Sequence, residues 1–237
     1  MKTISIVMAT YNGEKYLREQ LDSIVKYLTP SDELIISDDG STDKTLEIIS
    51  EYSSKFTFIK LINGPRMGVV KNFENALLNS TKDIILISDQ DDIWLPEKID
   101  MMRSVFSKNK NLFLVNHDMY ISTDDDIKNN ILKVSSFERR KRKHGVFYNW
   151  YYSGYFGCCM GLSRTFLEKI LPFSKHVNLY DQWIGMLGEH YKSVLFLEKK
   201  LIIHREHGKN VSKEKTSIFF KIKVRLALLT AYLEKSK

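Results

Sequence analysis

The chain has 237 residues, of which 43% are hydrophobic, 12% aromatic and 27% charged. This composition excludes disordered, low-complexity and collagen-like proteins, and the length predicts one domain, or one domain with an appendage. The formal net charge is +7; the positive charge is concentrated in segments 139–143 and 213–237, and the rest of the chain is mildly acidic. A nucleic-acid-binding protein is therefore not expected, because its main fold would carry a basic face.

The sequence shows no sign of export or of membrane insertion. The two cysteines, Cys158 and Cys159, are adjacent, which excludes a framework of several disulfides and indicates a reducing compartment. The apolar run at 4–9 leads into polar residues, and no uninterrupted apolar stretch reaches the roughly 18 residues of a spanning helix. We expect a cytoplasmic protein.

The first half of the chain alternates between strand and helix patterns. Short apolar runs predict strands at 4–9, 33–37, 56–62 and 83–88. Helical periodicity predicts helices at 14–27, after 43, at 69–78 and from Pro96 to about residue 107. Repeated strand–helix units of this length indicate a parallel sheet with helices on both faces.

The second half is less regular. It is expected to contain a strand at 112–115, a loop or excursion at 116–130 and a buried segment at 157–162. Helices are expected at 164–170 and 181–190, and two short strands at 194–197 and 200–203. The aromatic run 147–152 could stack on sugar rings or fill the core. Segment 213–237 is apolar but interrupted by basic residues, so it fits a helix on a membrane surface and a packed terminal helix equally well.

Three polar clusters follow predicted strands: Thr10-Tyr11-Asn12, Asp38-Asp39 and Asp89-Gln90-Asp91-Asp92. Because ligands bind beyond the carboxyl ends of parallel strands, we expect the clusters to meet at one edge of the sheet. Crowded carboxylates repel one another unless a cation lies between them, and Mg²⁺ is often held by carboxylates plus substrate phosphates. Helix capping by Asp91 or Asp92 would account for one carboxylate but not for three.

The second cluster has two interpretations. Asp38-Asp39-Gly40-Ser41 is typical of a turn before a helix; alternatively, one carboxylate accepts a hydrogen bond from a base or a ribose, with Thr10 and Tyr11 against the base. The chain has no glycine-rich phosphate loop. Phosphates would then be held by a metal and a basic side chain such as Lys71.

Segments 4–12, 34–43 and 88–94 resemble family 2 glycosyltransferases of the GT-A fold in order and spacing. A weaker similarity at 157–160, 180–183 and 204–210 resembles bacterial polysaccharide transferases, including rhamnosyltransferase-like members. The resemblance implies an α/β fold: a Rossmann-like, mostly parallel central sheet with helices on both faces and a C-terminal helical appendage. It also implies one domain over 1–212, with a nucleotide-sugar half (1–110) and an acceptor half (111–212), followed by a basic amphipathic helix at 213–237.

The resemblance further implies roles for individual residues. Residues that bind the nucleotide or donor would be Thr10, Tyr11, Asn12, Glu14, Asp39, Lys71, Asp89 and Gln90. A divalent metal, Mg²⁺ or Mn²⁺, would be held by Asp89, Asp91 and His207. Asp181 would be the catalytic base, and Trp183 and Asp92 would belong to the acceptor side. Asp181 as a helix cap, His207 as an ordinary loop residue and the cysteines as packing residues remain the alternatives.

The function implied is an inverting transfer of a sugar from a UDP- or dTDP-sugar to a saccharide or lipid-linked acceptor hydroxyl. This would serve bacterial surface polysaccharide synthesis, of capsule or O-antigen, at the inner face of the cytoplasmic membrane if 213–237 contacts lipid. Two alternatives remain: a sugar nucleotidyltransferase, disfavoured by the missing glycine-rich loop, and a non-catalytic nucleotide-binding or scaffold module.

Overall fold

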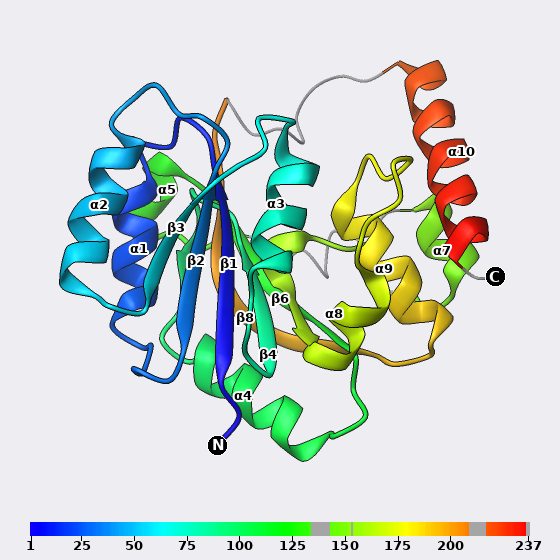
Figure 1. The fold of residues 1–237 in the computed structure, drawn as a ribbon, viewed down its shortest axis with the longest axis horizontal. Coiled ribbons are helices and arrows are strands. Elements are labelled where there is room, and N and C mark those ends of the chain that lie inside the picture. Colours follow the sequence, from blue (N-terminus) through cyan, green and yellow to red (C-terminus); the bar gives the residue numbers. More distant parts are fainter. Residues whose placement is uncertain (134–142, 153, 209–216, 236–237) are drawn as a thin grey trace.

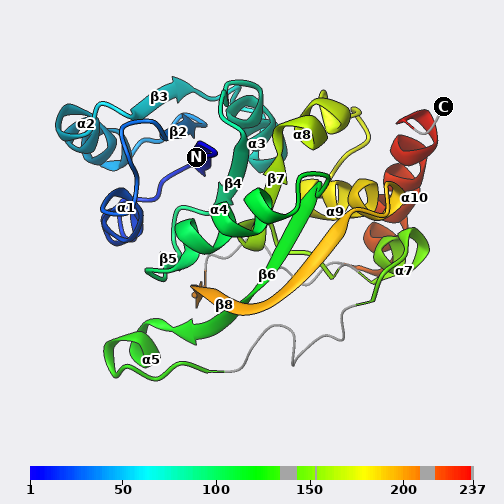
Figure 2. The ribbon, with the colours of Figure 1, turned by 90° about the horizontal axis from the view of Figure 1, so that it is seen from below.

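The computed structural model describes residues 1–133, 143–152, 154–208 and 217–235 (Figures 1 and 2). Its centre is one sheet of eight strands in the order β3-β2-β1-β4-β7-β6-β8-β5. The strands are β1 (Ile4–Thr10), β2 (Glu33–Asp38), β3 (Ile59–Asn63), β4 (Ile84–Ser88), β5 (Ile93–Trp94), β6 (Leu114–Thr123), β7 (Met160–Ser163) and β8 (Val194–Glu206). The predicted mixed α/β fold with a central sheet is confirmed.

The first four strands form the predicted parallel half of the sheet. β1 pairs in parallel with β2 and with β4, and β2 pairs in parallel with β3. Between them run α1 (Leu17–Val25), α2 (Thr45–Lys55) and α3 (Val69–Leu78), and α4 (Lys98–Lys108) follows β5. The strand–helix alternation read from the sequence is therefore correct, and the carboxyl ends of β1, β2 and β4 lie at one edge.

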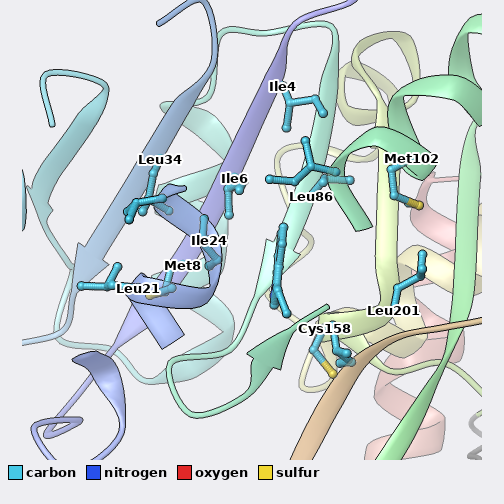
Figure 3. Close-up of a cluster of buried hydrophobic side chains, with 14 of the residues drawn as sticks. Ile4, Ile6, Met8, Leu21, Ile24, Leu34, Leu86, Met102, Cys158 and Leu201 are labelled. Atoms are coloured by element: carbon cyan, nitrogen blue, oxygen red, sulfur yellow. The ribbon is translucent and has the colours of Figure 1, made fainter. Parts of the chain in front are cut away.

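Alternate strand residues face two separate hydrophobic clusters. Ile4, Ile6 and Met8 of β1 point to the cluster that α1 and α4 cover, whereas Val7 points to the cluster on the opposite face. Figure 3 shows the first of these clusters, which includes Leu21 of α1 and extends to Met102, Leu201 and Cys158. The helices α3, α8 (Arg164–Ile170) and α9 (Tyr180–His190) cover the second.

The second half of the chain adds antiparallel strands to the sheet. β7 pairs antiparallel with both β4 and β6, and β6 pairs in parallel with β8. The loop or excursion predicted over 116–130 is corrected: β6 continues to Thr123, and α5 (Asp124–Lys128) follows it. The polar residues Asn116, His117 and Asp118 are buried within β6, where His117 Nδ1 lies 2.7 Å from the Asp118 carbonyl oxygen.

The two short strands predicted after residue 193 are also corrected. β8 is one continuous strand of 13 residues. Its pairing with β6 shifts register between His117 and Asp118, whose partners are Leu197 and Lys200. Glu198 and Lys199 are exposed at this irregularity, so they interrupt the apolar pattern without ending the strand.

The last helix, α10 (Ile218–Lys235), packs beside α7 (Val146–Tyr151) and α9 (Figure 1). Trp150 Nε1 donates to the Arg225 carbonyl oxygen at 2.8 Å, and Leu228 and Ala231 are buried in the second cluster. None of the described helices combines the length and the apolar character needed to cross a bilayer. The boundary predicted at 212/213, residues 213–216 and 236–237, and residues 139–142 of the basic run lie outside the described part of the chain.

Candidate active site

The first and third polar clusters are joined directly, because Gln90 hydrogen-bonds the backbone of Tyr11. The Tyr11 N–H donates to Gln90 Oε1 at 3.0 Å, and Gln90 Nε2 donates to the Tyr11 carbonyl oxygen at 3.1 Å. A Cβ on Gly13 would lie 2.4 Å from Gln90 Oε1, so a larger residue there would require the Gln90 side chain to shift. The Tyr11 ring is 58% exposed beside this junction. The structure thus brings together two loops that are 79 residues apart in sequence.

The two carboxylates after β2 have different surroundings. Asp38 is buried and accepts hydrogen bonds from the Thr10 and Ser41 hydroxyls and from the Gly40 and Ser41 amides. Asp39 is only half-buried, and its two oxygens accept the Arg66 and Gly68 amides at 2.7 and 2.8 Å. Asp38 therefore shapes the turn, as the structural interpretation expected, and Asp39 is the more accessible carboxylate.

Other residues assigned to the donor side have partners of their own. Asn12, with φ of 49°, accepts the Thr42 amide at 2.8 Å, which fixes the loop after β1 against the start of α2. Glu14 accepts the Lys44 amide at 3.0 Å, so its carboxylate satisfies an amide at the N-terminus of α2. Lys71 forms an ion pair with Glu74 at 2.5 Å on α3 and remains partly exposed.

The acidic loop after β4 holds three carboxylates close together. Burial raises the pKa of Asp89 well above its ordinary value, and the negative charges of Asp92 and Asp91 raise it further. Burial and Asp92 likewise raise the pKa of Asp91. Neighbouring carboxylates with raised pKa values are typical of functional sites, and a cation would stabilise their ionised forms.

Two histidines from the end of β8 face these carboxylates. His207 Nε2 lies 2.8 Å from Asp91 Oδ2, and His204 Nδ1 lies 2.8 Å from Asp92 Oδ1. Although burial opposes the charged imidazolium, Asp92 raises the pKa of His204 to about 10. Burial alone would raise the pKa of Asp92, but the His204 charge and hydrogen bond outweigh it and the pKa lies below its ordinary value. The predicted proximity of His207 to the acidic loop is therefore present in the structure.

Arg205 organises this edge of the sheet and was missed in the sequence. Its Nε donates to the Asp91 carbonyl oxygen at 3.1 Å, and its two terminal nitrogens pair with Asp124 at 2.7 Å and Glu19 at 2.5 Å. The guanidinium carbon lies 4.7 Å from the Tyr16 ring centroid, and that ring stacks on His207 at 4.8 Å. An arginine between two histidines in the segment 204–207 is the signal that could have indicated it.

Buried polar groups of Lys98, Cys158 and Cys159 lie next to the acidic loop. The Lys98 side chain is fully buried; its Nζ donates to the Cys158 carbonyl oxygen at 2.9 Å and lies 3.6 Å from the Trp94 ring centroid. Burial lowers the pKa of Lys98 to about 8. Cys158 and Cys159 are both buried and form no disulfide. One donor atom each from Asp89, Asp92, Cys158 and His204 lies within 4.8 Å of the others.

The residues assigned to catalysis and to the acceptor lie on α9. Asp181 is in the first turn of this helix, half-buried, and its charge contributes to the raised pKa of Asp89. The N-terminal end of a helix favours a carboxylate. Trp183, in contrast, is fully buried in the second hydrophobic cluster, so its indole packs inside the fold and offers no accessible surface to an acceptor.

The fold and this edge define a mixed α/β protein whose acidic and imidazole side chains gather beyond the carboxyl ends of its parallel strands. The sequence profile described as glycosyl transferase family 2 matches residues 5–171. The chain therefore belongs to glycosyl transferase family 2.

Curated relatives and solved structures agree with this assignment. The dTDP-rhamnosyl transferase RfbG of Shigella flexneri is 40% identical over 98 residues, which are 39% of this chain and 34% of that protein. The Escherichia coli UDP-Glc:alpha-D-GlcNAc-diphosphoundecaprenol beta-1,3-glucosyltransferase WfgD is 28% identical over 198 residues, 81% of this chain and 72% of that protein. The chain spans less than two thirds of the length of several other curated relatives.

Two solved structures share the fold. Residues 1–349 of TarS from S. aureus, in complex with UDP-GlcNAc, superpose with a TM-score of 0.75 at 20% identity, over 98% of this chain and 67% of that one. The mannosyltransferase PcManGT from Pyrobaculum calidifontis, in complex with GDP-Man and Mn²⁺, gives 0.63 at 17% identity, over 97% of this chain and 73% of that one. These likenesses establish the GT-A fold of the chain.

Proposed function

We propose that this protein is an inverting glycosyltransferase that moves a sugar from a nucleoside diphosphate to an acceptor hydroxyl. The observation that carries the proposal is the contact of Asp91 with His207, beside Asp89, at the sheet edge that also presents Tyr11 and Asp39. No specific observation favours a sugar nucleotidyltransferase or a non-catalytic binding module. The family assignment favours sugar transfer over nucleotidyl transfer.

The donor would bind across the carboxyl ends of β1, β2 and β4. The exposed Tyr11 ring provides a face for the base, and Asp39 provides an acceptor for a base N–H or ribose hydroxyl. Thr10 and Asn12 hold the loop that carries Tyr11, and Gln90 fixes this loop to the acidic loop. Glu14 and Lys71 are assigned supporting positions, since both already pair within the protein. A UDP- or dTDP-sugar is the proposed donor, as named for the two curated relatives.

Asp91 and His207, with Asp89 beside them, would hold the divalent cation. Their oxygen and nitrogen donors suit Mg²⁺ or Mn²⁺, and none of the described residues donates a hydrogen bond to the Asp89 carboxylate. The Asp91 and His207 donor atoms already lie 2.8 Å apart. A bound cation supplies positive charge against the departing diphosphate. Arg205 would keep the acidic loop in place by its hydrogen bond to the Asp91 carbonyl oxygen.

Asp181 is the proposed general base. It would accept the proton of the acceptor hydroxyl while the hydroxyl oxygen attacks the anomeric carbon from the face opposite the leaving diphosphate. The new glycosidic bond then forms as the bond to the diphosphate breaks, so the configuration inverts. The Asp92 carboxylate is buried against His204 and supports the acidic loop. We propose that Asp92 affects the acceptor side only indirectly, by holding this loop in place.

The donor site is tested first by a thermal-shift screen of UDP, dTDP and GDP with and without Mn²⁺. A ligand at 100 times its dissociation constant stabilises the folded state by about 2.7 kcal/mol. One nucleotide should raise the melting temperature in a metal-dependent manner, and Asp91→Ala should abolish the metal dependence. No shift with any nucleotide, in a folded protein, would contradict the proposal.

The base is tested with Asp181→Asn. Loss of general base catalysis should reduce transfer by about 100- to 10,000-fold, whereas the nucleotide-induced thermal shift stays. Asp100→Asn is a matched control, because Asp100 is also in the first turn of a helix but is exposed on α4. Retention of most activity in Asp181→Asn would refute the assignment. Detection of a glycosidic product, rather than pyrophosphate, separates sugar transfer from nucleotidyl transfer.

The acceptor is proposed to be a saccharide or a lipid-linked saccharide. We further propose that the helical appendage that follows the domain over 1–212 contacts the inner surface of an anionic membrane, where a lipid-linked acceptor would lie. Phe219, Ile222 and Leu226 of α10 are 80%, 48% and 56% exposed. Their spacing of three and four residues places them on one face of the helix, away from the buried Leu228 and Ala231. Exposed Lys221 and Lys223 add charge complementary to anionic lipid.

Co-sedimentation with vesicles tests this contact. The protein should bind vesicles of phosphatidylglycerol and phosphatidylcholine more strongly than vesicles of phosphatidylcholine alone. Phe219→Glu combined with Leu226→Glu should remove the binding. Leu46→Glu, which replaces an exposed leucine on α2, should not. Equal binding by both variants, or no binding by the unmodified protein, would refute the membrane contact.

A further inference from the structure

A second group of potential metal-donor atoms, other than those of the Asp91–His207 pair, lies at the buried side of the acidic loop. Asp89 follows β4, Asp92 precedes β5, Cys158 lies in the short helix η1 (Gly157–Cys159) and His204 lies in β8. One oxygen, nitrogen or sulfur atom from each lies within 4.8 Å of the others. Cys158 belongs to the hydrophobic cluster of Figure 3, so the sulfur approaches from the core, whereas His204 is only partly buried.

Asp92 provides an independent indication that a ligand belongs there. Its side chain is fully buried, and Oδ1 accepts hydrogen bonds from His204 Nδ1 and the Arg205 amide. Oδ2 accepts no hydrogen bond from a nitrogen or oxygen of the described residues, and the Cys158 thiol beside the carboxylate helps to lower the pKa of Asp92. A thiol is only a weak hydrogen-bond donor, so a buried carboxylate oxygen with no stronger partner favours a cation.

We infer that Asp89, Asp92, Cys158 and His204 form a binding site for a thiophilic divalent cation of the Zn²⁺ class. Two carboxylates, one imidazole and one thiolate provide four donors, the number that Zn²⁺ prefers. Sulfur also distinguishes this site from the Asp91–His207 pair, because thiolate favours Zn²⁺ whereas carboxylate oxygens suit Mg²⁺ and Mn²⁺. On binding, the Cys158 thiol and the His204 imidazolium release their protons to solvent as the metal–sulfur and metal–nitrogen bonds form. No electron is transferred.

This site has a consequence for sugar transfer, which rests on the proposed function. Asp89 is shared with the proposed donor site, so a cation bound below would withdraw Asp89 from the donor. Zn²⁺ should then inhibit transfer even in the presence of Mn²⁺, and Cys158→Ser should relieve this inhibition. The binding itself depends on no catalytic activity, so it is tested separately.

The decisive measurement is a titration of the full chain with Co²⁺, a spectroscopic substitute for Zn²⁺. A thiolate-to-cobalt charge-transfer band in the near ultraviolet, together with intense visible bands of a tetrahedral ion, is expected, and Zn²⁺ should displace both. Cys158→Ser should abolish the charge-transfer band. It should also weaken Zn²⁺ binding by at least about 100-fold, because loss of an outer partner of a metal ligand alone costs 10- to 100-fold.

Two matched variants identify the site. Cys159→Ser changes the neighbouring buried cysteine and should keep the band, and Asp91→Asn changes the other metal pair and should keep it too. If Cys158→Ser does not fold, as judged by circular dichroism, His204→Gln should still replace the tetrahedral spectrum by a weaker one. A band that persists in Cys158→Ser, that disappears in Asp91→Asn, or that is absent from the folded protein would overturn the inference.

Discussion

The replacement Glu33→Gln should destabilise the fold in a pH-dependent manner. Glu33 is buried at the start of β2, where Oε1 accepts hydrogen bonds from Ser5 of β1 and Thr81 before β4, at 2.7 Å and 2.6 Å. Lys60 of β3 pairs with Oε2 at 3.0 Å. Burial alone would raise the pKa of Glu33, but these hydrogen bonds outweigh it and lower the pKa from 4.5 to about 2.

The magnitude follows from linkage between protonation and folding. A pKa that is lower in the folded than in the unfolded state means that the ionised form stabilises the fold. The difference between 4.5 and about 2 corresponds to about 3 kcal/mol, since one pH unit is worth about 1.4 kcal/mol. This stabilisation is complete above the unfolded pKa and is lost as the pH falls through the folded pKa.

Urea unfolding at several pH values measures the effect. Glutamine resembles the protonated acid, so Glu33→Gln should lower the free energy of unfolding by about 3 kcal/mol at pH 7 and by roughly half as much near pH 3. Lys60→Met is the control, because its side chain is 56% exposed and surface pairs contribute less than about 1 kcal/mol. A loss in Glu33→Gln that is the same at every pH would refute the reasoning.

Three further substitutions test particular contacts. Gly157→Ala would place a Cβ 2.0 Å from Tyr180 Oη, and the resulting shift at the start of α9 should slow sugar transfer by about 100-fold without changing nucleotide binding in the thermal-shift assay; unchanged turnover would contradict this. Arg103→Met removes the ion-pair partner of the buried Asp32, which keeps only its hydrogen bonds from Ile4 and Thr29. Urea unfolding should therefore show a loss of about 3–5 kcal/mol, and a loss below 1 kcal/mol would count against it. Leu228→Ala should lower the free energy of unfolding by about 2–5 kcal/mol in the same assay, because the Leu228 side chain of α10 is only 1% exposed within the second hydrophobic cluster. A change near zero would mean that α10 does not pack there.

Local patterns predicted the elements whose boundaries the neighbouring residues determine. Helices α3 and α8 have the predicted bounds, 69–78 and 164–170, because turn residues or strands flank a clear helical periodicity. β6 and β8 were not predicted correctly, because burial of polar residues in β6 and the bulge in β8 depend on the pairing of distant strands. No window of local sequence contains that information.

The site divides in the same way. That the carboxylates after β4 would lie beside Tyr11 followed from parallel strands ending at one edge, and the Gln90 contacts agree with this. Glu14 and Trp183 were assigned from the resemblance alone. The structure places Glu14 against the Lys44 amide at the start of α2 and Trp183 in the core. The position of Arg205 between His204 and His207 could have drawn attention to it, but its partners could not be inferred, because Asp124 and Glu19 come from α5 and α1 and meet it only in the folded chain.

The long β8 strand has a consequence for synthesis on the ribosome. Asp92 meets His204 across 112 residues, and Asp91 meets His207 across 116. The parallel strands β1 to β4 lie within the first 88 residues and can begin to associate early. The acidic loop, however, receives its imidazole partners only after residue 207 has left the exit tunnel. A nascent chain is therefore expected to form the parallel part of the sheet well before it can hold a cation. Metal-dependent donor binding should appear only once β8 and residue 207 have been added to the fold.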